Sequence, residues 1–120
     1  MKITTFNPLI ISKDAEKIVA LFEELGFEKH HNKQGDDFSS NRMKDANGFH
    51  VDIVQAAAPQ DMTSIRMNVD SFDEAFKLLS AHGFQGTEGG DARDTGSSKS
   101  AMMVSPSGFS ITIAEHIKDR

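Results

Sequence analysis

The chain has 120 residues, the size of one globular domain that can bury a hydrophobic core without disulfide bonds or structural metal ions. It contains no cysteine, which excludes a disulfide scaffold, a thiolate nucleophile and metal sites with cysteine ligands. Thirteen basic and eighteen acidic residues give a formal net charge of -5 without a basic stripe, so we expect no nucleic-acid partner.

The N-terminal residues lead directly into a strand-like stretch. They lack the apolar segment and the cleavage site of a secretion signal. No later apolar run has the roughly 20 residues that a membrane-spanning helix needs. We therefore expect a cytoplasmic protein that neither spans nor binds a membrane.

The first predicted strand covers residues 9–11, and the first predicted helix follows in residues 14–27. Within this helix Ile18, Phe22 and Leu25 recur with the spacing of a single helix face. Acidic residues lie in its first turn, where the helix dipole favours negative charge. The pattern predicts an amphipathic helix whose apolar face packs against a sheet.

A turn and an alternating strand follow. The apolar residues of this strand, which should share the face under the helix, are Phe49, Val51 and Ile53. His50 and Asp52 alternate with them and should point to the opposite face. The strand therefore predicts one face packed in the core and one polar face.

The same order recurs in the second half of the chain. Residues 71–84 predict a second amphipathic helix, in which Ser71 and Glu74 have the spacing of a capping box. Gly26 and Gly83 follow the two helices as C-cap positions. The apolar face of the second helix consists of Phe72, Ala75, Phe76 and Leu79.

A second closing strand begins after the turn Ser105–Gly108, and its apolar face consists of Phe109, Ile111 and Ile113. Between the second helix and this strand, residues 85–99 are rich in glycine, serine, aspartate and threonine, which predicts a long mobile loop. Phe22 and Phe76 are the expected buried anchors of their helices. The order of strand, helix and strands thus occurs twice.

Three segments carry a family resemblance: Leu21-Phe-Glu-Glu-Leu-Gly-Phe27, Asp45-Ala-Asn-Gly48 and Ser105-Pro-Ser-Gly108. With the paired repeats, the chain resembles the glyoxalase/bleomycin-resistance (vicinal oxygen chelate) superfamily over nearly its whole length. The resemblance implies an α+β fold of two tandem βαβββ modules whose curled mixed sheets form a concave cavity. It implies one domain over residues 1–120, with modules at about 1–57 and 61–117, working as a homodimer. Pairing of the modules within one chain or across a swapped dimer stays open.

Metalloenzymes of this superfamily carry His or Glu ligands on the first and last strands of each module. The resemblance maps these positions to Phe6, or Asn7 if the strand is shifted by one, and to Asp52, Ser64 and Thr112. This set offers a single strong donor, whereas a divalent cation needs several anionic or imidazole donors. We therefore expect no metal ion and no cofactor. His50 could supplement Asp52 as a ligand, or both could simply face solvent.

Arg66 and Asn68 share the polar face of a predicted strand. The opposite, apolar face of that strand consists of Ile65, Met67 and Val69. In the fold that the resemblance implies, the polar face lines the cavity, where a guanidinium could bind a carboxylate or phosphate at two points. The alternative is that Arg66 only neutralises Asp52.

These residues lead to three hypotheses about function. The first is a metal-free small-molecule-binding protein, similar to the bleomycin-resistance branch that sequesters drugs, in which no residue is assigned a catalytic role. Its proposed ligand-binding residues are His50, Asp52, Ser64, Arg66, Asn68 and Thr112. The second is a divalent-metal-dependent lyase, isomerase or dioxygenase of the same superfamily, with His50 and Asp52 as ligands. The third is a protein–protein adaptor with a collapsed cavity.

Overall fold

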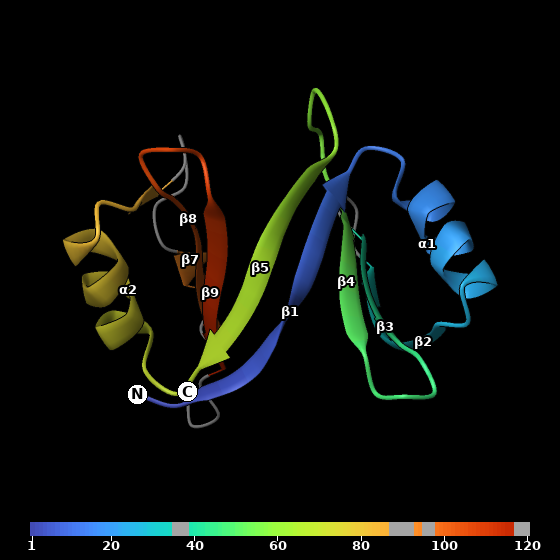
Figure 1. The fold of residues 1–120 in the computed structure, drawn as a ribbon, viewed down its shortest axis with the longest axis horizontal. Helices are drawn as coiled ribbons and strands as arrows, with labels where there is room; N and C mark the ends of the chain where they lie inside the picture. Colours follow the sequence, from blue (N-terminus) through green and yellow to red (C-terminus); the bar gives the residue numbers. More distant parts are fainter. Residues whose placement is uncertain (35–38, 87–92, 95–97, 117–120) are drawn as a thin grey trace. The chain divides into compact units, whose positions relative to one another are not determined.

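The computed structural model describes residues 1–34, 39–86, 93–94 and 98–116, in which the order strand, helix, strands occurs twice (Figure 1). The α+β fold of two tandem βαβββ modules is therefore confirmed. The elements are β1 (Ile3–Ser12), α1 (Ala15–Glu24), β2 (Glu28–Gln34), β3 (Ser39–Lys44), β4 (His50–Gln55), β5 (Met62–Val69), α2 (Phe72–Ala81), β6 (Gln85–Gly86), β7 (Arg93–Asp94), β8 (Ser98–Val104) and β9 (Ser110–His116).

The chain divides into two compact units, each with its own helix. The N-terminal unit comprises residues 7–64, and the C-terminal unit comprises residues 1–6 and 65–120. Neither described helix has the length and apolar character of a membrane span. The loop predicted over residues 85–99 lies largely outside the described residues. Its described parts are β6, β7 and the start of β8.

The sheet of the N-terminal unit has the strand order β2-β3-β4-β1. The pairs β2/β3 and β3/β4 are antiparallel, whereas β1 and β4 are parallel, with Ile10 opposite Ile53. A register shift lies between Lys29 and His31 in β2. Because β1 and β4 are the first and last strands of the module, the parallel pairing places their side chains next to each other.

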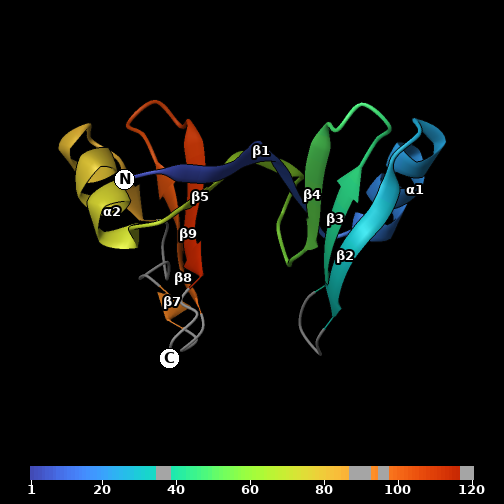
Figure 2. The same ribbon diagram turned by 90° about the horizontal axis from the view of Figure 1, so that it is seen from below.

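Helix α1 lies against one face of this sheet (Figure 2). The buried core under it consists of Ala15, Val19, Met43, Val51 and Ile53, with Ile10, Ile18, Phe22 and Phe27 packed against it. Val51 and Ile53 therefore confirm the predicted core face of β4. Phe49 does not belong to it: this side chain is 64% exposed, because β4 begins only at His50 and Phe49 is still part of the turn.

Leu25 was expected on the buried face of the first helix and is instead 60% exposed. The helix ends at Glu24, and a turn through Gly26, which has a φ of 102°, brings Phe27 back over the helix. The N–H of Phe27 donates to the carbonyl of Phe22 at 2.9 Å, and the two rings meet edge to face at 5.2 Å. Phe27 thus takes the core position predicted for Leu25.

Helix α2 ends in the same way as α1. The N–H of Phe84 donates to the carbonyl of Leu79 at 3.0 Å, and Gly83 between them has a φ of 88°. A left-handed glycine with this bond pattern is the Schellman ending. Both glycines predicted as C-cap positions are therefore confirmed in that role.

The C-terminal unit has the strand order β5-β9-β8-β6, with β7 also paired to β8 and β5 parallel to β9. Its core, covered by α2, consists of Met67, Val69, Phe72, Ala75, Leu79, Ala101, Met103 and Ile113. Phe22 and Phe76 were predicted as buried anchors, but both are only half-buried. The buried aromatic of α2 is Phe72. Phe109 is 49% exposed because β9 begins only at Ser110.

A side chain from the closing strand of each module accepts a hydrogen bond at the N-terminus of its helix, and in α2 the N-cap residue Ser71 does so as well. In α2, Ser71 accepts the N–H of Glu74 at 3.3 Å, as the capping-box pattern predicted. The N–H of Phe72 donates to Oε1 of Glu115 at 2.6 Å, and the N–H of Ala15 in α1 donates to Oε1 of Gln55 at 2.9 Å. Gln55 and Glu115 are each the sixth residue of β4 and β9.

Gln55→Ala and Glu115→Ala should each lower the free energy of unfolding by about 1 kcal/mol, because a helix N–H then loses its acceptor. Glu115→Gln should cost less, since it keeps an acceptor and loses only the charge that favours a helix N-terminus. Urea denaturation measures these differences, with the exposed Glu23→Ala on α1 as the control. Unchanged midpoints for Gln55→Ala and Glu115→Ala would contradict the capping role.

Candidate ligand-binding site

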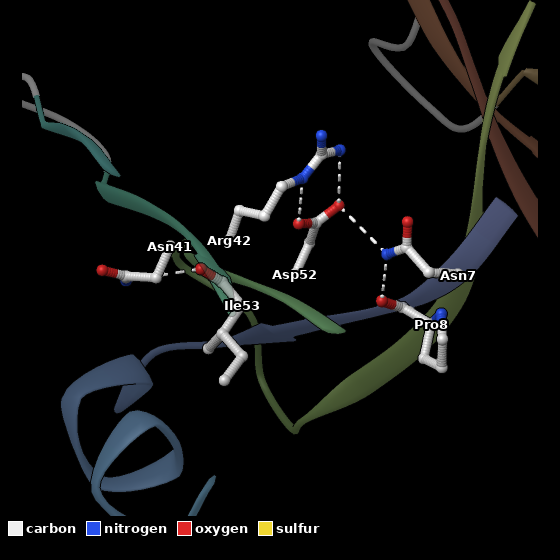
Figure 3. A network of polar contacts seen from close by, with 6 residues as sticks. All are labelled: Asn7, Pro8, Asn41, Arg42, Asp52 and Ile53. Carbon is white, nitrogen blue, oxygen red and sulfur yellow. Dashed lines mark hydrogen bonds and ion pairs between the residues drawn. The ribbon is translucent and has the colours of Figure 1, made fainter. Parts of the chain in front are cut away.

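The face of the N-terminal sheet opposite α1 carries a cluster of polar side chains. Met43 and Ile53 pack under the helix, so their neighbours Arg42 and Asp52 point to the other side of the sheet. Arg42 and Asp52 are direct cross-strand partners in β3 and β4. Asn7 reaches the same carboxylate from β1, as Figure 3 shows.

Asp52 is the centre of this cluster and is only 3% exposed. Nε of Arg42 donates to its Oδ1 at 3.1 Å, and Nη2 of Arg42 donates to Oδ2 at 3.4 Å. Nδ2 of Asn7 also donates to Oδ2, at 3.1 Å. A buried carboxylate needs such partners, because its desolvation is otherwise uncompensated. The Arg42 side chain keeps 33% exposure.

The side-chain amide of Asn7 forms hydrogen bonds through its nitrogen but not through its oxygen among the described residues. Its Nδ2 donates to Asp52 and to the carbonyl of Pro8 at 2.9 Å, which fixes the orientation of the amide. Its Oδ1 is buried and accepts no hydrogen bond from the part of the chain that the structure describes. In Figure 3 this oxygen points away from Asp52 and Pro8. A buried acceptor without a donor costs free energy.

The six residues predicted to bind a ligand are divided between the two units. In the N-terminal unit, Ser64 in β5 is 2% exposed and Asp52 is equally buried. His50 alternates with Asp52 along β4 but is exposed, since it is the first residue of the strand. The alternation therefore predicts correctly that His50 and Asp52 lie on the same face of the sheet. It does not show that His50 is exposed while Asp52 is buried.

In the C-terminal unit, the parallel register places Arg66 of β5 opposite Thr112 of β9. Asn68 lies two residues farther along β5 and is 6% exposed. These three side chains lie on the face opposite α2, because Met67 and Ile113 pack in the core under that helix. Arg66 and Thr112 are thus neighbours on that face.

One assignment on the opening strand needs correction. Phe6 is 62% exposed, so Asn7 holds the opening-strand position, as the alternative alignment had it. Within the N-terminal unit the ion-pair partner of Asp52 is Arg42. The coupling of Arg66 to Asp52 stays a prediction.

Arg42 was missed by the sequence reasoning, although the hairpin contains a signal for it. The N–H of Asp45 donates to the carbonyl of Phe49 at 3.0 Å, so these two residues close the turn. Counting back along both strands from this closing pair places Arg42 opposite Asp52. The same count in the second hairpin, from Ser105 and Phe109, places Met102 opposite Thr112. The charged pair of the first module is therefore a thioether and a hydroxyl in the second.

The positions that hold metal ligands in metalloenzymes of the superfamily do not fit a divalent cation here. Among them, Asn7, Asp52, Ser64 and Thr112, only one is a carboxylate. That carboxylate already binds the guanidinium of Arg42, whose positive charge opposes a cation at the same place. Among the described residues, His, Asp and Glu side chains form no group of three or more that could hold a metal ion.

No protein-family model and no curated protein matches this chain. Several solved structures match its fold. A glyoxalase/bleomycin resistance protein/dioxygenase superfamily member from Vibrio splendidus 12B01 has 13% identity and a TM-score of 0.62, and the match covers 95% of this chain and 99% of that one. Methylmalonyl-CoA epimerase from Mycobacterium tuberculosis has 13% identity and a TM-score of 0.68, covering 97% and 90%.

A glyoxalase I mutant from Zea mays matches with 15% identity and a TM-score of 0.69. That match covers 95% of this chain and 43% of the maize chain. At such identities the likeness concerns the backbone and the order of its elements. The chain has the fold of the glyoxalase/bleomycin-resistance (vicinal oxygen chelate) superfamily.

Proposed function

We propose that this protein binds a small molecule on the helix-free face of its N-terminal sheet and does so without a divalent metal ion. The observation that carries this proposal is the buried cluster of Asn7, Arg42 and Asp52. Its carboxylate is engaged by a guanidinium and an amide, and the amide still offers an unsatisfied buried acceptor. A ligand that donates to this acceptor would remove the cost of burying it.

A purely structural role explains only part of the cluster. Arg42 compensates the buried charge of Asp52 and fixes the pairing of β3 with β4. An unsatisfied Oδ1 in Asn7 adds nothing to that stability. Polar groups held in place by others and left incompletely bonded are typical of binding sites. The cluster therefore supports binding more strongly than a structural role alone.

The C-terminal unit provides a second proposed group of ligand contacts. It consists of Arg66, Asn68 and Thr112, and Oδ1 of Asn68 is a buried acceptor without a hydrogen bond from the described residues. Arg66 is the residue in this group that could bind an anionic ligand group at two points. Ser64 and His50 complete the proposed contacts in the N-terminal unit. Homodimer formation and a cytoplasmic location also stay proposals.

The alternative is a metal-dependent lyase, isomerase or dioxygenase. Its support is the fold shared with methylmalonyl-CoA epimerase from Mycobacterium tuberculosis and with glyoxalase I from Zea mays. A metal site there would require the ion pair between Asp52 and Arg42 to break, so that Asp52 and the exposed His50 could both coordinate the metal ion. Because two donors from one strand do not complete a coordination shell, we favour metal-free binding.

Protein dialysed against a chelator should keep its melting temperature when zinc, manganese, nickel or iron(II) is added. A metal that binds only the folded state must raise its stability by mass action, so thermal denaturation is a direct test. Asp52→Asn is the matched control, since it removes the one carboxylate at the mapped positions. A saturable rise in the wild type that Asp52→Asn abolishes would contradict metal-free binding.

A further inference from the structure

We propose that Asn47 is a site of spontaneous deamidation, at which the side-chain amide is converted to aspartate or isoaspartate. The residue lies in the turn that joins β3 to β4 (Figure 1). The reaction needs an asparagine followed by a residue whose backbone nitrogen can attack the asparagine side chain. Asn47 precedes Gly48, and this is the one Asn-Gly pair in the sequence. The modification goes beyond the proposed function and does not depend on it.

The side-chain amide of Asn47 is open to attack. The residue is exposed, and its amide forms no hydrogen bond with the part of the chain that the structure describes. The other asparagines are less suited to the reaction. Asn7 precedes a proline, which has no N–H to lose, and Asn32 precedes a lysine, whose Cβ hinders the attack. Asn41 and Asn68 are buried within strands.

Gly48 supplies a backbone nitrogen without steric hindrance. Glycine has no Cβ, which in any other residue stands beside the attacking nitrogen. The surroundings of Gly48 are open as well, since a Cβ placed there would have no atom within 4 Å. Its φ of 89° lies in the left-handed region that favours glycine. The turn therefore favours the residue that makes its neighbour Asn47 reactive.

The reaction has two steps and consumes only water. Solvent base takes the proton from the N–H of Gly48, and the nitrogen attacks Cγ of Asn47. The new C–N bond closes a five-membered succinimide ring, while the bond from Cγ to Nδ2 breaks and Nδ2 leaves as ammonia with a proton from solvent. Water then opens the ring. Opening at Cγ gives aspartate, whereas opening at the backbone carbonyl carbon gives isoaspartate, whose main chain runs through Cβ and Cγ.

The hydrogen bonds of the turn control the rate of the first step. The N–H of Gly48 donates to the carbonyl of Asp45 at 3.1 Å, so its nitrogen is engaged while the turn is closed. Oδ1 of Asp45 accepts the N–H of Asn47 at 3.0 Å and the N–H of Phe49 at 2.8 Å. The attack therefore starts from an opened turn, a local event that needs far less free energy than global unfolding. Asp45 is a positioning residue that slows the reaction.

The second module has the same turn without the reactive side chain. Ser107 stands where the first turn has Asn47, and Ser105 stands where it has Asp45. The N–H of Gly108 donates to the carbonyl of Ser105 at 2.9 Å, so the backbone hydrogen bond is the same. Oγ of Ser105 also accepts a backbone N–H at 3.0 Å, without a charge. Because this turn accepts serine at both positions, Asn47→Ser and Asp45→Ser are variants that should keep the fold.

Incubation of the full chain near neutral pH and at body temperature tests the site. Over days the wild type should form a product that is heavier by about 1 Da and carries one more negative charge, since an amide becomes a carboxylate. Ion-exchange chromatography separates it, and peptide fragmentation locates the change. An isoaspartate-specific methyltransferase with S-adenosylmethionine detects the isoaspartate. Asn47→Ser should form no such product. A wild type that keeps its mass, or a product that also forms in Asn47→Ser, would overturn the assignment.

Variants of Asp45 test its role in the closed turn. Asp45→Ala should form the product about ten-fold faster than the wild type, because the two backbone N–H groups lose their side-chain acceptor. Asp45→Ser keeps a hydroxyl acceptor and should react more slowly than Asp45→Ala. Equal rates in the wild type and in Asp45→Ala would show that these hydrogen bonds do not control the reaction.

The product should weaken the hairpin. Isoaspartate adds one carbon atom to the main chain of the turn and a negative charge near the carboxylate of Asp45. Asp45 and Phe49 close this hairpin, and the pair of Arg42 and Asp52 lies on the same two strands. The isolated isoaspartate form should therefore unfold at a lower urea concentration than the unmodified protein. An unchanged midpoint would contradict this effect on the hairpin.

Discussion

Phe72→Ala should lower the free energy of unfolding by about 3 to 5 kcal/mol, the usual cost of removing a buried aromatic side chain. The ring is 4% exposed at the start of α2 and belongs to the core of the C-terminal unit. It also stacks in a tilted arrangement with Phe76, with 5.8 Å between the ring centres. The substitution would leave a cavity between the helix and the sheet, where neighbouring side chains relax only partly.

Leu78→Ala is the matched control for Phe72→Ala, because Leu78 lies on the same helix and is 50% exposed. Its replacement should change the free energy of unfolding by about 0.5 kcal/mol or less. Phe76→Ala should fall between the two, since Phe76 is half-buried. Urea denaturation measures all three. Equal shifts for Phe72→Ala and Leu78→Ala would show that the buried face of α2 has been assigned wrongly.

The sequence predicted the two modules because their signals are local. A helix face, a capping box and a glycine after the last turn each depend on residues within one or two helical turns. The structure confirms this for Ser71, Gly26 and Gly83. The errors at Phe49 and Phe109 arose at element ends, where the alternating pattern continues into the turn before the strand begins.

Strand β3 explains why the site was predicted only in part. Its sequence, Ser-Ser-Asn-Arg-Met-Lys, has one apolar residue, so no alternation marks it as a strand. Without β3, the partner of Asp52 in the hairpin could not be recognised. The sequence paired Asp52 with Arg66, the arginine on a strand that the alternation did identify, and that pairing stays a prediction. The contact between Arg42 and Asp52 depends on the pairing of β3 with β4, which the alternation within one strand does not show.

The local sequence pattern also could not predict how deeply each site residue is buried. His50 and Asp52 look equivalent in the sequence, but one is exposed at the end of the hairpin and the other is 3% exposed in the middle of the sheet. Burial depends on how many strands flank a position, and Asp52 has β3 on one side and β1 on the other. This difference decides which of the two can be held rigidly by neighbours.

Arg42→Met should lower the free energy of unfolding by about 2 to 3 kcal/mol. It leaves the buried carboxylate of Asp52 with fewer partners, and the partial exposure of Arg42 places the cost below that of a fully buried pair. Lys44→Met, which removes a charge from the same strand without a described contact to Asp52, should have a clearly smaller effect. Urea denaturation of each variant supplies the free energies.

The double variant Arg42→Met with Asp52→Leu should recover most of this loss, because it removes the charge that needed compensation. The coupling energy from this double-mutant cycle should lie between about 0.5 and 3 kcal/mol, as it does for residues in direct contact. The corresponding cycle of Arg66→Met with Asp52→Leu uses the same Asp52 variant and measures the coupling that the sequence predicted. A coupling energy near zero between Arg42 and Asp52 would contradict the compensating role of Arg42.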